Sequence, residues 1–544
     1  MLSVASDMEA GMRSVMTHAF SQVPRADIPR SSFDRSHGYK TTFDAGYLVP
    51  IYVDEALPGD TFNLQLTSFA RLATPLHPFM DNMFLDAFFF AVPMRLVWSN
   101  FQRFMGEQDN PTDSTDFLVP TMTSPAVTGY AANSLHDYFG LPTEVPGLEH
   151  SSLWHRAYNL IYNQWFRDQN LQNSVVVDMD DGPDNPADYV LLRRGKRHDY
   201  FTSCLPWPQK GPAVELPLGA TAPVIGIGWN GVPNTAAAGM NVRETTGTRT
   251  YTFAFGNTGA DVTGNFRIEA DSNIGATAKP KIYADLTEAT AATINQLRQA
   301  FQIQKIYERD ARGGTRYTEL IQAHFGVTSP DARLQRSEYL GGGSVPLNIN
   351  PIAQTSSSDT EPTPQGNLAA MGTVHMSGVG FTKSFTEHTL LIGMVCARAD
   401  LNYQQGLDRM WSRSTRFDFY WPALSHIGEQ AVLNKEIYAQ GTANAAQDAA
   451  VFGYQERFAE YRYKQSRITG EFRSNFATPL DTWHLAQDFA SLPALNSTFI
   501  VENPPVSRVI AVQDEPQFLY DSYVRLRCAR PMPVYSVPGL IDHF

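Results

Sequence analysis

The alternation of apolar and polar residues predicts β-strands toward both ends of the chain. Phe62, Leu64 and Leu66 alternate with polar residues, which is the period of a strand with one buried face. The run from Met83 to Val97 is apolar on both alternating faces and predicts a strand that is covered on both sides. Pro93 has no N–H to donate to a neighbouring strand, so this strand must end, bulge or lie at a sheet edge there. Further strands are predicted at Thr389–Ala397, Thr415–Trp421, Arg508–Val512 and Tyr523–Cys528.

Helical periodicity appears between these strand-rich regions. Apolar residues recur on one face of residues 151–168 and again over residues 287–308, and residues 316–325 are a third candidate helix. Residues 341–366 are rich in Gly, Ser and Pro and predict a long surface loop. Strands at both ends, with helices and loops between them, favour an antiparallel sandwich with large insertions over repeated βαβ units.

Residues 219–275 differ in composition from the rest of the chain, because they are rich in Gly, Thr and Ala and poor in charge. Tyr251, Phe253 and Phe255 alternate with small or polar residues, and a Gly-Asn-Thr-Gly turn follows. This pattern predicts a small β-rich insertion with its own hairpins. Residues 226–231 match GxGxxG, but the Val-Pro-Asn that follows opens no helix for a pyrophosphate, so we interpret the glycines as a turn.

Composition indicates a chain with much buried surface. Charged residues make up 18% of the 544 residues and aromatic residues 12%, a balance expected when many side chains are buried in a core or at subunit contacts. The cysteines Cys204, Cys396 and Cys528 are far apart and predict buried free thiols made in a reducing compartment. We expect neither a secretory signal nor membrane insertion, because the N-terminus has no long apolar block and the Met83–Val97 run is too short to span a bilayer.

Motifs for catalysis are missing from the sequence. It contains no HExxH, GxSxG or Walker loop, so we expect neither an enzyme nor a bound cofactor. Asp178, Asp180 and Asp181 lie in an acidic run that superficially resembles a calcium loop. Its glycine comes one position early and a tyrosine replaces the bidentate Glu, so a solvated loop is the default and an adventitious metal site the alternative. His150 and His155 are interpreted as histidines on a helix face.

Three basic clusters are candidates for contact with nucleic acid. Cations hold phosphates and rings stack on bases, which suits single-stranded nucleic acid. The alternative is that these clusters are solvated faces or salt-bridged subunit contacts. Because the net charge is −13, a nucleic-acid role requires a local basic face or a separate basic partner. The clusters are Arg25, Arg30, Arg35 and Lys40; Arg193, Arg194, Lys196, Arg197 and His198; and Arg457, Arg462, Lys464, Arg467 and Arg473, the last interleaved with Tyr454, Phe458, Tyr461 and Tyr463.

Seven blocks that together span nearly the whole chain carry a family resemblance. They are FDRSHGYKTTFDAGYLVPIYVDEALPGDTF (Phe33–Phe62), PFMDNMFLDAFFFAVPMRLVW (Pro78–Trp98), HRAYNLIYNQWFRDQNLQ (His155–Gln172), SCLPWPQKG (Ser203–Gly211), YTELIQAHFGVTSPDARLQRSEYLGG (Tyr317–Gly342), ARADLNYQQGLDRMWSR (Ala397–Arg413) and RCARPMPVYSVPGLIDHF (Arg527–Phe544). In this order they resemble the major capsid protein of gokushoviruses, single-stranded DNA bacteriophages of the microvirus family. The resemblance is weakest at about 212–285 and 343–366.

This resemblance implies a structural protein whose fold is an eight-stranded antiparallel jelly roll with long loop and helix-containing insertions. Sixty copies would form a T=1 icosahedral shell through pentamers around circular single-stranded DNA. A large insertion of the family forms protrusions at the threefold axes, and host attachment is the expected role of the matching insertion here. The implied partners are an internal scaffolding protein, a small basic DNA-binding protein, a pilot protein and a host surface receptor, with assembly in the bacterial cytoplasm and residence in the virion.

We therefore expect four parts: an extended N-terminal arm (1–60), the first jelly-roll strands with a helical insertion (61–211), a β-rich surface insertion (212–285), and a helical insertion with the remaining strands and a C-terminal tail (286–544). Two other interpretations stay open, a recognition protein that binds a glycan or receptor through residues 219–275 and an enzyme on a β-scaffold. The genome-facing candidates are Arg25, Arg30, Arg35, Lys40, Arg457, Arg462, Lys464 and Arg467, and the receptor candidates are Trp229, Asn230, Tyr251, Phe253 and Phe255.

Overall fold

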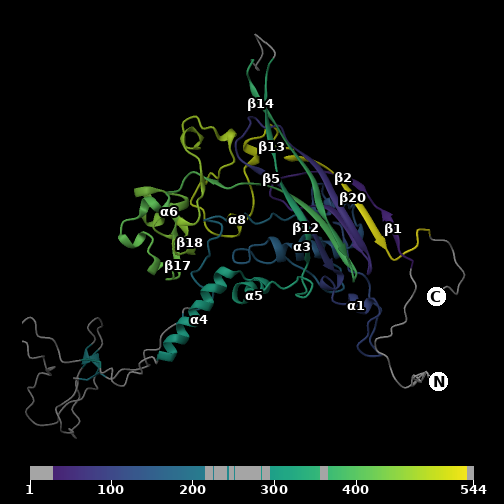
Figure 1. The fold of residues 1–544 in the computed structure, drawn as a ribbon, viewed down its shortest axis with the longest axis horizontal. Coiled ribbons are helices and arrows are strands. Elements are labelled where there is room, and N and C mark those ends of the chain that lie inside the picture. Colours follow the sequence, from purple (N-terminus) through teal and green to yellow (C-terminus); the bar gives the residue numbers. More distant parts are fainter. Residues whose placement is uncertain are drawn as a thin grey trace, which may run out of the picture. The chain divides into compact units, whose positions relative to one another are not determined.

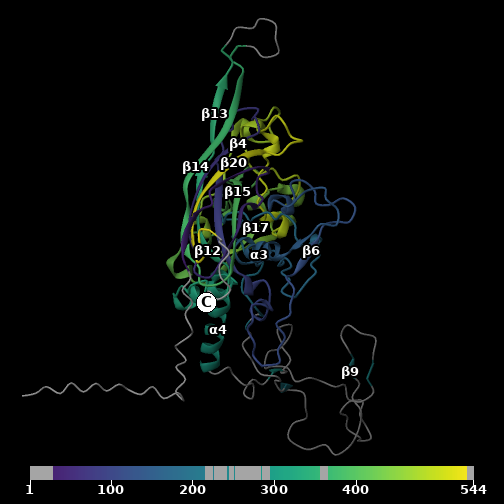
Figure 2. The same ribbon diagram turned by 90° about the vertical axis from the view of Figure 1, so that its right-hand side faces the viewer.

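The computed structural model divides the chain into two compact units, one made of residues 1–208 and 313–544 and the other of residues 209–312. Figures 1 and 2 show the elements of both units as ribbons in two views. The structure describes residues 29–212, 214, 224–225, 242–243, 250–251, 283–284, 294–355 and 365–535.

The larger unit is built on two antiparallel sheets (Figure 1). A six-stranded sheet has the order β1–β20–β4–β14–β13, with β2 also paired to β20, and a four-stranded sheet has the order β12–β5–β15–β3. β1 and β2 pair one after the other along β20, and β13 forms a hairpin with β14. Along the chain, the other strands alternate between the two sheets, except that β5 and β12 follow one another in the four-stranded sheet. The predicted antiparallel β-sandwich is confirmed, and this strand order is consistent with a jelly roll. The bounds are β1 Ser31–Asp34, β2 His37–Phe43, β3 Val49–Ala56, β4 Thr61–Leu72, β5 Met83–Pro93, β12 Glu338–Pro346, β13 Asn348–Ala353, β14 Leu368–Ser384, β15 Thr389–Ala399 and β20 Phe518–Arg530.

The strand β5 is covered on both faces, as its sequence predicts. Phe89 points into the core between the sheets, where its ring meets Tyr52 edge-on at 6.3 Å between centroids. Phe90 points to the opposite face and packs against Trp165 at 5.5 Å. The strand ends at Pro93 and a 3-10 turn follows, which confirms the role predicted for this proline.

The helix α3 (Leu153–Ile161) covers the outer face of the four-stranded sheet and continues into a π-turn at Tyr162–Phe166. Its apolar stripe contributes Leu153, Ala157 and Ile161 to a second apolar cluster that also contains residues of β5 and β15. The helix predicted over residues 151–168 is thus confirmed in type and place. The helix α5 (Tyr317–Phe325) is confirmed as well. The remaining short helices of this unit are α1 Phe101–Phe104, α2 Leu135–Tyr138, α6 Asn434–Ile437, α7 Ala445–Asp448 and α8 Ser497–Ile500.

A third apolar cluster organises the chain between β15 and β20. It joins Phe201 and Cys204 to Tyr403, Val432 and other residues around a small antiparallel sheet of β17 and β18. All three cysteines of the chain are buried and free, as predicted. The short strands of this unit are β6 Thr121–Thr123, β7 Glu149–Ser151, β16 Asn402–Tyr403, β17 Glu429–Leu433, β18 Val451–Glu456 and β19 Ser466–Arg467.

Two predicted strands are wrong. Residues 415–421 form a 3-10 turn at Arg416–Asp418, because the Asp418 carboxylate accepts hydrogen bonds from the backbone N–H groups of Ser414 and Thr415 at 3.0 and 2.7 Å. Residues 508–512 follow another 3-10 turn and make a single isolated bridge, from Ile510 to Pro75. Val509 and Ile510 are buried by loop packing, which leaves an apolar pattern without a strand.

The predicted loop over residues 341–366 is also wrong in its first part, where β12 and β13 run. The glycines that suggested a loop are required by close packing between strands. A Cβ at Gly342 would collide with the carbonyl oxygen of Ala87 on β5, and one at Gly341 would lie 2.6 Å from the carbonyl oxygen of Gly380 on β14. Residues 356–364 lie outside the described residues.

The smaller unit contains most of the helix α4 (Ile294–Gly313) and four very short strands that pair as β9–β10 and β8–β11. Residues 287–293, the start of the predicted helix, lie outside the described residues, as do Trp229, Asn230, Phe253, Phe255 and the GxGxxG segment. Tyr251 belongs to β10, where it pairs with Val242. The strands are β8 Val224–Ile225, β9 Val242–Arg243, β10 Thr250–Tyr251 and β11 Tyr283–Ala284.

Candidate nucleic-acid and assembly surface

Large exposed rings and arginines gather on one surface formed by the turns after β16 and the turn after β18. Phe417, Phe419, Tyr420, Trp421 and Tyr461 are each close to half exposed. Such exposure is unusual for side chains of this size in a folded protein. We call this the basic–aromatic surface and define it by Arg413, Arg416, Phe417, Phe419, Tyr420, Trp421, Arg457, Phe458 and Tyr461.

The arginines of this surface stack on its rings. The Arg413 guanidinium lies 4.3 Å from the centre of the Tyr461 ring, and that of Arg416 lies 4.6 Å from the Phe417 ring. The Arg457 guanidinium, 4.6 Å from the Phe458 ring, also donates a hydrogen bond to the carbonyl oxygen of Phe417 at 3.1 Å. Cation–π contacts of this kind hold both partners in place while leaving ring faces and charge available to a ligand.

Ring packing joins the two segments that form the surface. Tyr420 meets Phe458 at 5.3 Å and Tyr461 at 6.2 Å between ring centroids. Phe458 itself is buried, and its ring also meets Tyr461 at 6.2 Å. The rings near residue 458 stand out in the sequence, but residues 415–421 were predicted as a strand, so the part of their rings in this surface was missed.

The predicted genome-facing residues that follow this surface are paired with acids of the same chain. Arg462 pairs with Glu456, and Lys464 and Arg467 share Asp408 at 3.3 and 2.6 Å. Burial alone would raise the pKa of Asp408, but a hydrogen bond from the Met410 N–H and the two cations hold this pKa below its usual value. Arg462 and Lys464 remain at least half exposed despite these pairs.

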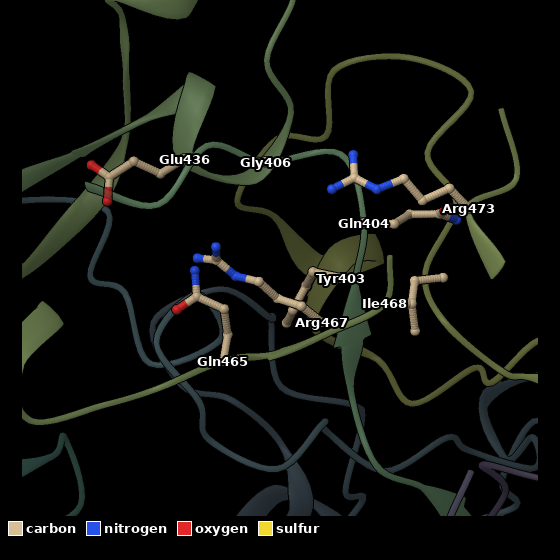
Figure 3. A pocket seen from close by; sticks show the side chains of 8 residues that line it. All are labelled: Tyr403, Gln404, Gly406, Glu436, Gln465, Arg467, Ile468 and Arg473. Atoms are coloured by element: carbon tan, nitrogen blue, oxygen red, sulfur yellow. The ribbon is translucent and has the colours of Figure 1, made fainter. Parts of the chain in front are cut away.

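A small polar cleft lies beside these cations (Figure 3). Its volume is about 30 Å³, which is room for about one water molecule and too little for a nucleotide. Figure 3 shows Arg467 and Gln465 on one side of the cleft and Arg473 beside Gln404 on the other. The lining residues are Tyr403, Gln404, Gly406, Glu436, Gln465, Arg467, Ile468 and Arg473.

The described N-terminal candidates lie elsewhere, in and beside β1 and β2 of the six-stranded sheet (Figure 1). Arg30 directly precedes β1, Arg35 lies between β1 and β2, and Lys40 belongs to β2. Arg30 donates a hydrogen bond to the Thr61 hydroxyl, and Arg35 forms an ion pair with Asp54 at 2.7 Å. Lys40 pairs with Asp521 in an exposed position, at 2.7 Å. Arg25 lies outside the described residues.

The cluster at residues 193–198 is mostly structural. Arg194 pairs with Asp86 at 2.7 Å, and the Arg193 guanidinium lies 4.0 Å from the centre of the Tyr47 ring. Lys196 lies over the Phe499 ring, and burial lowers its pKa. Only Arg197 and His198 of this cluster are exposed.

The acidic loop is folded around a buried arginine of α3. The Arg156 side chain is fully buried and binds both carboxylate oxygens of Asp184, at 2.5 and 2.6 Å. Asp181 accepts hydrogen bonds from the indole N–H of Trp98 and from Asn100, while Asp180 lies 3.2 Å from Arg156 and Asp178 accepts one from a tyrosine hydroxyl. These carboxylates are thus engaged by protein groups. No cluster of three or more ligating side chains that could hold a metal ion occurs among the described residues.

The described part of the chain contains no helix that is both long and apolar enough to cross a membrane. A family profile described as capsid protein (F protein) matches residues 21–540. The chain belongs to this family. As a capsid protein, it assembles with further copies of itself into a shell and resides in the virion, and its role is structural.

Named relatives of this F-family chain bear out the predicted resemblance to microviruses of the gokushovirus type. Capsid protein VP1 of Bdellovibrio phage phiMH2K is 52% identical over 537 residues, with 97% of this chain and 98% of the relative covered. Capsid protein VP1 of Chlamydia phage 1 is 45% identical with the same coverage. Capsid protein VP1 of Spiroplasma virus 4 is 39% identical, with 96% of this chain and 97% of the relative covered.

Proposed function

We propose that sixty copies of this chain assemble through pentamers into a T=1 icosahedral shell that encloses single-stranded DNA, without catalytic activity. Closed symmetry gives every copy the same contacts and buries the same surfaces in each. The jelly-roll sandwich and the resemblance to gokushovirus capsid proteins support this arrangement. Assembly takes place, in this proposal, in the bacterial cytoplasm with the help of an internal scaffolding protein and a pilot protein.

The basic–aromatic surface is the observation that carries the proposal for the genome. Unpaired nucleotides expose both base faces and phosphates, so rings and arginines side by side bind them without requiring a particular sequence. Apart from the buried Phe458, the rings of this surface are about half exposed, and its arginines already lie over ring faces at 4.3–4.6 Å. We propose that it faces the shell interior, with Arg462, Lys464 and Arg467 nearby as phosphate contacts and Arg25, Arg30, Arg35 and Lys40 as a second set.

The charge of the chain bears on the same proposal. A net charge of −13 on each copy would repel an enclosed polyanion if it faced inward. Local basic surfaces therefore have to provide the attraction, together with a small basic DNA-binding protein packaged in the same shell. The four sequence-defined parts of the chain remain part of this proposal, with 212–285 as the surface insertion and 1–60 as an arm that includes β1, β2 and β3 of the two sheets.

A double variant, Trp421→Ala with Arg416→Gln, tests the role of the basic–aromatic surface. Particles of normal diameter should form, but the nuclease-protected DNA per particle should fall several-fold because a stacking ring and a phosphate contact are lost. The matched control is Tyr523→Ala with Arg525→Gln on β20, another exposed ring and arginine pair. Loss of shells in the first variant would instead identify the surface as a subunit contact.

Charge reversal provides the complementary test at the neighbouring cations. Arg462→Glu with Lys464→Glu should reduce DNA packaging more than assembly if these side chains contact phosphates. Arg467 is left unchanged because it is the less exposed of the two cations that pair with Asp408, with 30% of its side chain exposed against 69% for Lys464. Failure of pentamers to form would show that these residues lie between subunits.

The surface insertion at 212–285 is proposed to attach the particle to a host receptor, with Trp229, Asn230, Tyr251, Phe253 and Phe255 as candidate contacts. Its distinct composition and its separation into a compact unit support this proposal. Deletion of residues 219–275 should leave particle assembly intact and reduce adsorption to host cells. Adsorption equal to that of the unaltered particle would exclude the attachment role.

A further inference from the structure

Three histidines from separate elements meet in one buried cluster on α3. They are His136 of α2, His150 of β7 and His155 of α3, and the sequence analysis singled out only the last two. The ring centroids of His136 and His155 lie 4.7 Å apart, and those of His150 and His155 lie 5.3 Å apart. The His155 side chain is only 2% exposed and that of His136 only 6%.

Hydrogen bonds in the cluster are consistent with three neutral rings. The Nδ1 of His150 lies 2.9 Å from the carbonyl oxygen of Ser151, an acceptor, so this nitrogen carries the proton. Its Nε2 is then free to accept from the Tyr130 hydroxyl, 2.7 Å away. The Nδ1 of His136 lies 2.9 Å from the Nε2 of His155 and shares one proton with it.

An additional proton has no favourable place in this cluster. The Nδ1 of His155 is buried without a hydrogen-bond partner, so a proton there would leave a buried N–H unsatisfied. A proton on the Nδ1 of His136 would place two N–H donors against each other at the contact with His155. Positive charge on any ring would also lie within 6.5 Å of the next ring.

Among the described residues, no carboxylate contributes to the pKa of His136 or of His155. Tyr130 stacks on His136 at 3.8 Å, and Tyr189 meets His155 edge-on at 5.9 Å. The Tyr189 hydroxyl is itself hydrogen-bonded to Asp178 and Asp184, and Arg156 already neutralises Asp184. The other neighbours are the Phe139 ring, edge-on to His155 at 4.8 Å, and a backbone hydrogen bond between His136 and Pro186, which favours the charged form of His136 but is outweighed by burial.

We propose that this cluster, defined as His136, His150 and His155, is a proton-operated latch that holds residues 121–151 against α3 at neutral pH and releases them in acid. The segment it holds runs from β6 through α2 to β7. The same segment reaches the six-stranded sheet, where the Tyr138 hydroxyl donates to the carbonyl oxygen of Thr42 at 2.8 Å. Release would thus loosen a connection between α3 and β2, and it gives the shell a built-in response to acid.

The direction of the pH effect follows from the titration of the buried rings. Burial, followed by the charge of His150, lowers the pKa of His136 to about 4, and burial with both neighbours lowers the pKa of His155 further below its usual value. In the unfolded chain both rings titrate near 6.5. Their contribution to stability is therefore complete above about pH 6.5 and declines as the pH falls toward about 4.

Hydrogen–deuterium exchange with mass spectrometry tests the latch. The assembled particle is measured at about pH 7 and about pH 4.5, and the rates are corrected for intrinsic exchange. Peptides from residues 121–161 should lose protection at least about tenfold more than peptides from β4 and β20. Uniform exchange across the chain, or retained protection at 121–161, would overturn the proposal. This comparison needs no variant, so it decides the question even if cluster variants fold poorly.

The variant His155→Gln provides the causal test. Its amide can still donate a hydrogen bond to His136 but cannot be protonated, so the pH of release should shift downward by about one unit or more. The control is His426→Gln, because His426 is exposed and outside the cluster. An unchanged release pH in His155→Gln would contradict the latch.

Discussion

Arg156 is completely buried, and two carboxylate oxygens of Asp184 satisfy its guanidinium group at 2.5 and 2.6 Å. The same side chain donates to the carbonyl oxygens of Val97 and Asp180, at 3.0 and 2.8 Å, so it ties both the turn after β5 and the acidic loop to α3. Removing one partner of such a buried ion pair destabilises the fold much more than replacing both partners with apolar residues. The reason is that the remaining charge stays buried without a counter-charge.

We predict that Asp184→Asn destabilises the folded protein by about 3–5 kcal/mol, because it leaves the buried Arg156 without its main counter-charge. Asp188→Asn, in the same acidic run but exposed, should change the free energy of unfolding by less than about 0.5 kcal/mol. Chemical denaturation of both variants measures the difference. Equal effects would show that the acidic loop is simply solvated.

The sequence could not distinguish these two aspartates. Both lie in one acidic run, and the arginine that separates their roles is 28 residues away along the chain. The histidine cluster has the same origin, because His136 and His155 are 19 residues apart and only the packing of α2 on α3 brings them together. Sequence spacing reveals a site when the interacting side chains belong to one helix or strand, and the side chains of these two sites come from different elements.

At the scale of elements, β12 depends on glycine for its place between two strands. It pairs with β5, with a bulge between Tyr339 and Gly341, and its glycines approach backbone atoms on both sides. Glycine usually weakens a strand, but β12 requires it, because any side chain at these positions would push the neighbouring backbone away.

We predict that Gly342→Ala lowers the free energy of unfolding by roughly 1–3 kcal/mol, because its Cβ overlaps the carbonyl oxygen of Ala87. The control is Gly38→Ala in β2, where the nearest atom to a new Cβ would be the carbonyl oxygen of Ser522 at 3.6 Å. That variant should be neutral or slightly stabilising, because alanine restricts the unfolded chain. Thermal unfolding of the two variants compares them, and a neutral Gly342→Ala would contradict the strand assignment.

Strands with a clear burial pattern were the predictable ones. β4 alternates strictly between buried and exposed residues, and β15 is buried throughout, so apolar periodicity identified both. Residues 415–421 show a similar alternation of rings, yet Asp418 closes a turn and the rings stay exposed. Periodicity reports which residues are apolar, and it cannot report whether they are covered by this chain or by something else.

At the scale of the whole chain, the jelly roll joins segments from opposite ends of the sequence. His37 pairs with Val524 and Leu64 with Leu526, so β2 and β4 flank β20. Such pairings leave no local signal, and the fold class was predictable chiefly because the sequence blocks resemble a known capsid family. No pattern of the fold predicts the exposed basic–aromatic surface, and we propose enclosed single-stranded DNA as its ligand.

We propose that a closed shell of identical copies presents the basic–aromatic surface to single-stranded DNA. A side-chain-resolution density map of the DNA-filled particle tests this arrangement. Such a map should show sixty equivalent copies with nucleotide density stacked on the rings around Trp421 at the inner wall. A map in which a neighbouring copy covers these rings, or in which they face the outside, would contradict it.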